Sequence, residues 1–181
     1  NSSSVSVTVN ALDDASFSYD AAAYCVDDSD PTPTITGLAG GTFSGGVGLS
    51  INTSTGAIDV STSTPGTYTV TYTTAGTCPN SSNVSVSINA ADDATFGYAA
   101  AAYCTNEIDP TPTITGLAGG SFSSSPAGLT INGSSGVIDV STSTPGIYTV
   151  TYTTAGTCPS SSNVTVTINT VDDASFNYSA A

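Results

Sequence analysis

The chain has 181 residues, and its 14 acidic side chains give a net charge of −14 because it contains no lysine, arginine or histidine. Without cations it cannot neutralise phosphates, which excludes binding to nucleic acid and to an anionic membrane surface. The composition also removes histidine bases, lysine nucleophiles and the usual hydrolytic triads, so it predicts a non-enzyme. No apolar run is long enough to span a bilayer, which predicts no direct membrane insertion.

Apolar and polar residues alternate along much of the chain, which predicts strands and no long helix. The first predicted strand is 3–10, where three valines share one face. The second is 15–19, where Phe17 and Tyr19 alternate with serines. The alanine run at 99–102 is the one helix-prone stretch, and it is too short to form a helix alone.

The rest of the first predicted domain consists of further strands separated by Gly-rich or Pro-Gly turns. In the long segment 67–74, Tyr68, Val70 and Tyr72 point to one face and threonines to the other. The predicted strands after 15–19 are, in chain order, 34–36, 42–44, 49–52, 57–60, 67–74 and 83–89.

About seven short strands in roughly 80 residues, each with one apolar face, favour an all-β sandwich. The apolar faces define a candidate core, with the cysteine pair expected at one end of the sandwich. The predicted core residues are Phe17, Tyr19, Ile35, Leu38, Phe43, Leu49, Ile51, Ile58, Val60, Tyr68, Val70, Tyr72, Val84, Val86 and Ile88.

The sequence repeats itself with a period of about 80 residues, which is typical of a tandem array of small domains. DPTPTITGLAGG at 30–41 returns at 109–120, and YTVTYTTAGTCP at 68–79 returns at 148–159. The one-residue difference in period lies in a loop, where GTFSGGVGL at 41–49 becomes GSFSSSPAGL at 120–129.

The repeat pattern predicts four segments. Residues 12–90 and 91–170 are expected to be two complete domains. Residues 1–11 match 80–90 and are expected to be the last strand of a preceding repeat, and residues 171–181 match the opening of each repeat and are expected to be the first strand of a following one. The chain is therefore interpreted as an interior part of a longer protein.

Each repeat contains two cysteines at matching positions, Cys25 with Cys78 and Cys104 with Cys158. Two cysteines per repeat, without histidine and without a CxxC motif, favour one disulfide inside each domain over a metal or redox site. Such a bridge would stabilise a small core and indicates an oxidising, extracellular location.

The segment 48–73, GLSINTSTGAIDVSTSTPGTYTVTYT, resembles the Ig-like repeats of very large cell-surface proteins of Bacteroidota. The shared pattern is a Gly-Leu strand, an Asn-x-x-x-Gly turn, an isoleucine strand and a Gly-x-Tyr strand. The resemblance implies tandem Ig-like domains that build adhesin stalks or surface filaments, without catalysis. PGTY at 65–68 is further interpreted as a tyrosine corner, in which the tyrosine hydroxyl bonds to an upstream backbone group.

Acidic residues cluster where successive domains should meet and in the loops after the first cysteine of each repeat. Oxygen ligands gathered at such junctions could hold Ca²⁺ and stiffen the array, although solvated acidic turns that cap strand ends are the favoured explanation. No EF-hand loop pattern is present. The candidate calcium ligands are Asp13, Asp14, Asp28, Asp30, Asp92, Asp93, Glu107 and Asp109.

Together these features predict a structural repeat of an extracellular fibre or adhesin stalk that acts as a spacer on the cell surface. Its partners would be neighbouring repeats or identical subunits. Two alternatives remain open. The chain could be a filament subunit polymerised by strand donation through its terminal strands, with strand 3–10 completing a domain of another chain. It could also be a module that binds carbohydrate or another surface ligand.

Overall fold

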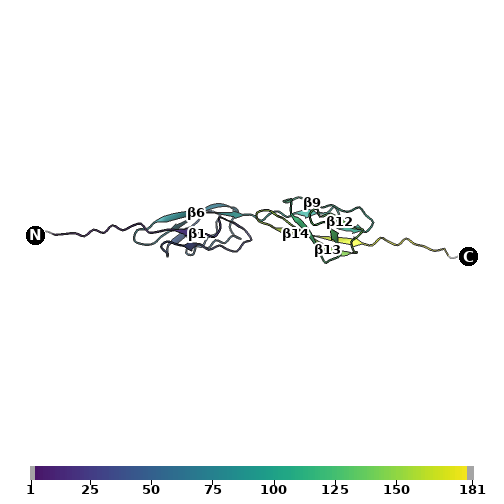
Figure 1. Cartoon of the computed structure of the whole chain (residues 1–181), viewed down its shortest axis with the longest axis horizontal. Helices are drawn as coiled ribbons and strands as arrows, with labels where there is room; N and C mark the ends of the chain where they lie inside the picture. The colour runs from purple at the N-terminus through teal and green to yellow at the C-terminus, as the bar shows by residue number, and fades with distance from the viewer. Residues whose placement is uncertain (1–2, 179–181) are drawn as a thin grey trace. The chain divides into compact units, whose positions relative to one another are not determined.

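The computed structural model describes residues 3–178 and contains two compact units, Asn1–Ala91 and Asp92–Ala181. Within the described residues all regular structure is β, and no helix is long and apolar enough to cross a membrane. Each unit is described by itself below. Figure 1 labels β1 and β6 in the first unit and β9, β12, β13 and β14 in the second.

The first unit contains two long strands and several short ones. Its strands are β1 (Phe17–Ser18), β2 (Ala23–Cys25), β3 (Thr34–Ile35), β4 (Thr42–Ser44), β5 (Gly66–Thr73) and β6 (Ser81–Asn89). Four of them form a sheet in the order β2-β6-β5-β4, and β1 pairs with β3 on the other layer. An isolated bridge, Ile51↔Ile58, replaces the two strands predicted at 49–52 and 57–60.

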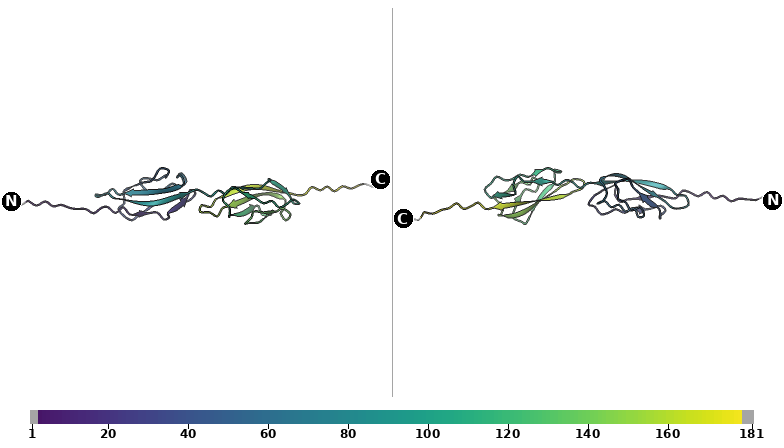
Figure 2. Two further views of the ribbon diagram at one scale, coloured as in Figure 1. Left: turned by 90° about the horizontal axis from the view of Figure 1, so that it is seen from above. Right: turned by 180° about the vertical axis from the view of Figure 1, so that it is seen from behind.

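The second unit repeats this arrangement. Its strands are β7 (Phe96–Gly97), β8 (Ala102–Cys104), β9 (Thr113–Ile114), β10 (Ser121–Ser125), β11 (Thr130–Ile131), β12 (Ile138–Asp139), β13 (Gly146–Thr153) and β14 (Ser161–Asn169). The large sheet has the order β8-β14-β13-β10, with β7-β9 and β11-β12 as small sheets. The views in Figure 2 show the long strands of each unit running along its length.

The long strands form because their alternation places one face in the core and the other in solvent. In β5, Val70 and Tyr72 are fully buried, whereas the threonines between and after them are partly or fully exposed. β5 pairs antiparallel with β6 over eight residues, from Gly66↔Ile88 to Thr73↔Ser81. The prediction of an all-β sandwich is therefore confirmed for each unit.

Each unit has its own hydrophobic core. In the first, Phe17, Phe43 and Tyr72 form an aromatic cluster in which the Phe17 and Phe43 rings meet edge to face, with centroids 5.5 Å apart. Most predicted core residues are buried or pack against this cluster. The prediction that Leu38 belongs to the core is wrong. Its side chain is 42% exposed because it lies in the loop after β3, against the turn that contains Gly76.

The tyrosine corner is present in both units. The hydroxyl of Tyr68 donates to the backbone carbonyl of Thr64, and the hydroxyl of Tyr148 donates to that of Thr144 at 2.6 Å. Each bond ties the start of a long strand to the turn that precedes it.

Strands β2 and β8 are not predicted by the sequence pattern. Both are three-residue strands that end an alanine run, and alanine has a low strand propensity. They become strands through parallel pairing with the ends of β6 and β14, for example Tyr24↔Ile88.

The strands predicted at the two ends of the chain are not formed in the described residues. Residues 3–11 and 170–178 form no strand, and residues 1–2 and 179–181 lie outside the described part.

Candidate functional site: the two cysteine-bearing ends of each unit

Each unit has an exit end, defined here as the end where its last strand stops. In the first unit β6 stops at Asn89, which is the register partner of Cys25 at the end of β2. The N–H of Val26 donates to the carbonyl of Asn89 at 3.0 Å, which extends the pairing by one residue. The chain then turns back, with the Cys25 N–H donating to the Asp28 carboxylate at 2.7 Å.

The exit end of the second unit has the same backbone geometry. Cys104 at the end of β8 is the register partner of Asn169, the last residue of β14. The N–H of Thr105 donates to the carbonyl of Asn169 at 3.1 Å, and that of Glu107 donates to the carbonyl of Cys104 at 3.0 Å.

The opposite end is the entry end, where the chain comes into the unit beside the other cysteine. In the first unit the N–H of Asp13 donates to the carbonyl of Cys78 at 2.9 Å, and the Cys78 Sγ lies 4.0 Å from the carbonyl oxygen of Asn10. In the second unit the N–H of Asp92 donates to the carbonyl of Cys158 at 2.8 Å.

The predicted disulfides inside each domain, Cys25–Cys78 and Cys104–Cys158, are wrong. Cys25 and Cys158 are disulfide-bonded, whereas Cys78 and Cys104 are free thiols. The two cysteines of a unit lie at opposite ends of a nine-residue strand. At about 3.3 Å per residue these ends are roughly 26–30 Å apart, and a disulfide requires Cα atoms within about 7 Å.

The first acid of each junction pair holds the entry end together. The carboxylate of Asp13 accepts a hydrogen bond from the Thr74 hydroxyl at 2.9 Å, and that of Asp92 accepts from the Thr154 hydroxyl at 2.8 Å. The Asp92 carboxylate also accepts from the backbone of Gly156 at 3.0 Å. These oxygens therefore fasten the turn that carries the entry cysteine.

The second acid of each pair closes a local turn. The carboxylate of Asp14 accepts from the backbone and hydroxyl of Ser16, and that of Asp93 accepts from the same groups of Thr95. The hydroxyl donors, followed by the backbone donors, hold the pKa of both carboxyl groups below their usual value.

The remaining candidate calcium ligands lie at the exit end. The carboxylates of Asp30 and Asp109 accept from the N–H groups of Val60 and Val140, each at 3.1 Å. Glu107 is exposed, and its side chain has no hydrogen-bond partner among residues 3–178. Within one unit, the acids at the entry end and those at the exit end are therefore held apart, in the same way as the two cysteines.

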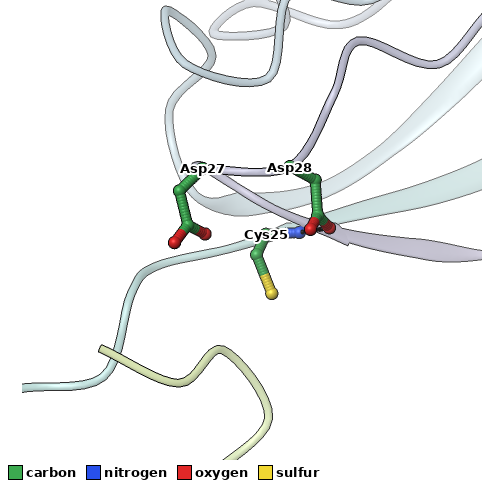
Figure 3. A group of neighbouring side chains, drawn as sticks. All are labelled: Cys25, Asp27 and Asp28. Carbon is green, nitrogen blue, oxygen red and sulfur yellow. Dashed lines mark hydrogen bonds between the residues drawn. The ribbon is translucent and has the colours of Figure 1, made fainter. Parts of the chain in front are cut away.

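Among the described residues, the one group with metal-ligand spacing is Cys25, Asp27 and Asp28. Figure 3 shows the Asp28 carboxylate beside the Cys25 nitrogen, with the Asp27 carboxylate and the Cys25 sulfur pointing the same way. A sulfur in a disulfide is not a thiolate ligand, so two exposed carboxylates remain. The calcium site stays a prediction, and the group that the structure gathers includes one of its eight candidate ligands, Asp28.

A shallow depression lies on the side of the second unit. It measures about 520 Å³ and is lined by Thr130, Ile131, Asn132, Ser135, Val137 and Asp139. Its lining contains no aromatic side chain on which a sugar ring could stack.

No family model and no curated protein matches the chain. It is similar to the solved structure of mouse cadherin-23 EC22–24, at 16% identity over 90% of this chain and 67% of that chain, with a TM-score of 0.33. It is also similar to domains 3–6 of protocadherin gamma B2, at 11% identity, 90% and 53% coverage and a TM-score of 0.38. The insect immune protein hemolin matches at 14% identity, 86% and 46% coverage and a TM-score of 0.41. The chain thus spans about half the length of the last two, and similarity at this level assigns no function to it.

Proposed function

We propose that this chain is a non-enzymatic structural repeat of an extracellular fibre or adhesin stalk, acting as a rigid spacer on the cell surface. One observation carries the proposal: in each unit the chain enters at one end of the last strand and leaves at the other. Repeats built in this way follow one another in series, so each added repeat contributes its own length.

The contribution of one repeat follows from the strand and the linker. β6 has nine residues, which span about 30 Å. Only Ala90 and Ala91 separate Asn89 from Asp92, whose N–H is already bonded in the second unit. A linker of this length adds at most about 10 Å, so each repeat should extend the chain by roughly 40 Å.

The chemistry of the chain suits an exposed extracellular position. Disulfide-bonded cysteines persist in oxidising compartments. A chain with acidic and no basic side chains has a net negative charge, which keeps extended chains apart and soluble. The resemblance of segment 48–73 to the Ig-like repeats of Bacteroidota surface proteins supports the same assignment. The partners would be neighbouring repeats of the same protein.

Strand donation is the less favoured alternative. Segment 3–10 copies the sequence of β6, so a donated strand would take the β6 position of another unit. In both units that position is filled by the chain's own strand, paired over eight residues with β5 or β13. A carbohydrate module is not favoured either, because the depression on the second unit lacks an aromatic platform.

The spacer function is tested by measuring length against repeat number. Tandem chains with two, three and four in-phase repeats would be studied by small-angle scattering, with and without a reductant. We expect the maximum dimension to grow by about 40 Å per repeat. Growth that follows the cube root of mass, as in a compact particle, would overturn the proposal.

Strand donation is separated from a continuous chain by electrophoresis of the native material under denaturing, reducing conditions. A continuous stalk gives one very large band. Separate subunits give a band that corresponds to the chain mass of 17.8 kDa.

A further inference from the structure

The first segment of each unit lies alongside the start of its last strand. In the first unit the N–H of Asp13 donates to the carbonyl of Cys78 at 2.9 Å, and the side-chain amide of Asn80 donates to the carbonyl of Asp13 at 3.0 Å. The hydroxyl of Ser82, in β6, donates to the carbonyl of Ala15 at 2.5 Å. These contacts are called the entry patch below.

The two sides of the entry patch run in the same direction. Residue numbers rise together along it, from Asp13 beside Asn80 to Ala15 beside Ser82. At the exit end, β2 also pairs parallel with the end of β6. The first part of the unit is therefore parallel to the last strand at both ends of that strand.

A buried threonine bonds to both sides of the entry patch. Thr74 is 3% exposed, and its hydroxyl donates to the carboxylate of Asp13 at 2.9 Å. The same hydroxyl accepts the backbone N–H of Asn80 at 2.9 Å. Hydrogen bonds of this kind are stronger away from water, because the local dielectric constant is lower. One hydroxyl thus joins the incoming chain to the residue that precedes β6.

The second unit contains the same contact. The hydroxyl of Thr154 donates to the carboxylate of Asp92 at 2.8 Å and accepts the N–H of Ser160 at 2.8 Å. The hydroxyl of Ser162, in β14, donates to the carbonyl of Ala94 at 2.5 Å. The entry patch is therefore a property of the repeat.

We propose that each unit bears tension along the chain, and that the entry patch is the contact that resists this tension first. A unit in a continuous chain is pulled by its first segment at the entry end and by the end of its last strand at the exit end, in opposite directions. Because the two sides of the entry patch are parallel, these pulls slide one side along the other. The inference goes beyond the spacer function, since a spacer can be long without resisting force.

The parallel orientation determines how the hydrogen bonds share the load. When two segments slide along each other, the bonds between them are stretched together and must break together. When one segment is peeled away from an end, its bonds break one at a time. The few bonds of the entry patch therefore give more resistance in this orientation than the same number would give in peeling.

A second buried hydroxyl of the first unit lies outside the entry patch and provides a matched control. Ser63 is 5% exposed, and its hydroxyl donates to the carbonyl of Asp59 at 2.7 Å and accepts the N–H of Ser50 at 2.9 Å. It resembles Thr74 in burial and in joining two parts of the chain. Both of its partners belong to the stretch 50–63, so pulling on the ends of the unit should not load these bonds first.

Unfolding of single molecules at constant force tests the proposal. The whole chain would be pulled from its two ends with dithiothreitol present, so that no disulfide limits its extension. Each unit should unfold in a step of roughly 220–250 Å, because about 80 residues at 3.3–3.6 Å each replace a folded repeat of about 40 Å. Units that open without a resolved step would contradict the proposal.

The decisive variant is Thr74→Val, which keeps the shape of the side chain and removes its hydroxyl. It should raise the rate of forced unfolding of one unit roughly ten- to hundredfold, which is the effect of leaving one buried polar group unpaired. The other unit should unfold as it does in the unaltered chain.

Ser63→Ala is the control for general destabilisation. Both variants should lower the urea concentration at the midpoint of unfolding, because each removes a buried, bonded hydroxyl. Under force, Ser63→Ala should change the unfolding rate by less than about threefold, since its bonds are still formed when the entry patch opens. Equal acceleration by the two variants would overturn the proposal.

Further variants keep the test decisive if Thr74→Val does not fold. Ser82→Ala removes one partly buried bond of the entry patch, and Thr154→Val with its control Ser143→Ala repeats the comparison in the second unit. If none of these changes to the patch accelerates forced unfolding more than its control does, the load-bearing role is refuted. The spacer function would remain, because the length per repeat measured by scattering does not depend on resistance to force.

Discussion

Replacing Tyr72 by phenylalanine should destabilise the first unit through two backbone groups that lose their partner. The Tyr72 side chain is fully buried, and its hydroxyl donates to the carbonyl of Leu38 at 2.7 Å and accepts from the N–H of Gly41 at 2.9 Å. Phenylalanine preserves the ring packing against Phe43, at 4.6 Å between centroids, so almost no volume is lost. The change therefore isolates the hydroxyl.

The expected loss follows from the cost of leaving polar groups unpaired, which is about 1–3 kcal/mol for each buried group. Both hydrogen bonds are only partly buried, so we expect a total of about 2–3 kcal/mol. For a domain of this size that corresponds to a fall in melting temperature of roughly 10–20 °C. Calorimetry or urea unfolding followed by circular dichroism would measure it.

Two controls make this measurement decisive. Tyr178→Phe removes a hydroxyl from a side chain that is 90% exposed, and should change the unfolding free energy by no more than about 0.5 kcal/mol. Tyr152→Phe removes the equivalent bonds to Leu117 and Gly120 in the second unit, and should produce the same loss there. If Tyr72→Phe is no worse than Tyr178→Phe, the hydroxyl does not hold the loop after β3 in the way described.

Three further results are expected. Burial raises the pKa of Tyr19 to about 12, and burial together with the hydrogen bond to the carboxylate of Asp20 raises the pKa of Tyr24 to about 12. Because both values lie above the unfolded value of about 10, the stability that these two groups contribute is complete below pH 10 and is lost as pH rises toward 12. Tyrosinate absorbance that rises fully near pH 10 in the folded protein would contradict this. Gly116→Ala should destabilise the second unit strongly because a Cβ there would lie 2.2 Å from a backbone oxygen, whereas Gly97→Ala meets nothing within 4 Å and should be nearly neutral in the same thermal melt. Calcium bound at the predicted acidic sites would stabilise the protein by about 2.7 kcal/mol at a concentration of 100 times its Kd. Because most of these carboxylates already accept hydrogen bonds from the protein, we expect a chelator to leave the melting temperature unchanged. A lower melting temperature in chelator would contradict this and support a calcium site.

Much of the fold could be predicted because the strongest signals are local. The alternation in 67–74 and 83–89 fixes the two longest strands and the faces they bury, and the observed β5 and β6 differ from these ranges by one or two residues at their ends. The tyrosine corner was predictable for the same reason, since its donor and acceptor lie four residues apart.

The state of the cysteines could not be predicted, because it depends on a strand that carries no local signal. Cysteine spacing alone cannot show which end of a sandwich each residue occupies. That position is set by the parallel pairing of Cys25 with Asn89, and the preceding alanines give no alternation from which to infer it. The assumption that two cysteines in one repeat pair with each other replaced the missing information and was wrong.

The acidic residues illustrate a second limit of sequence reasoning. A carboxylate that binds a cation and one that accepts a backbone N–H look the same in a sequence. The structure separates them: Asp13 and Asp92 fasten the turn that carries the entry cysteine, and Asp30 and Asp109 accept from the backbone N–H groups of Val60 and Val140. An acidic residue at the same position of both repeats therefore indicates a structural hydrogen bond as much as a metal-binding site.

Comparison of the two units shows which local features both share. The entry turn TAGTCP is identical at 74–79 and 154–159. The exit turn keeps its cysteine and its backbone pairing, but Asp27 and Asp28 become Asn106 and Glu107. The insertion in the second repeat falls at the outer strand β10, which has five residues where β4 has three. The outer strand therefore differs between the two units, whereas the backbone geometry of both ends is the same in each. The pair of carboxylates beside Cys25 is not repeated in the second unit.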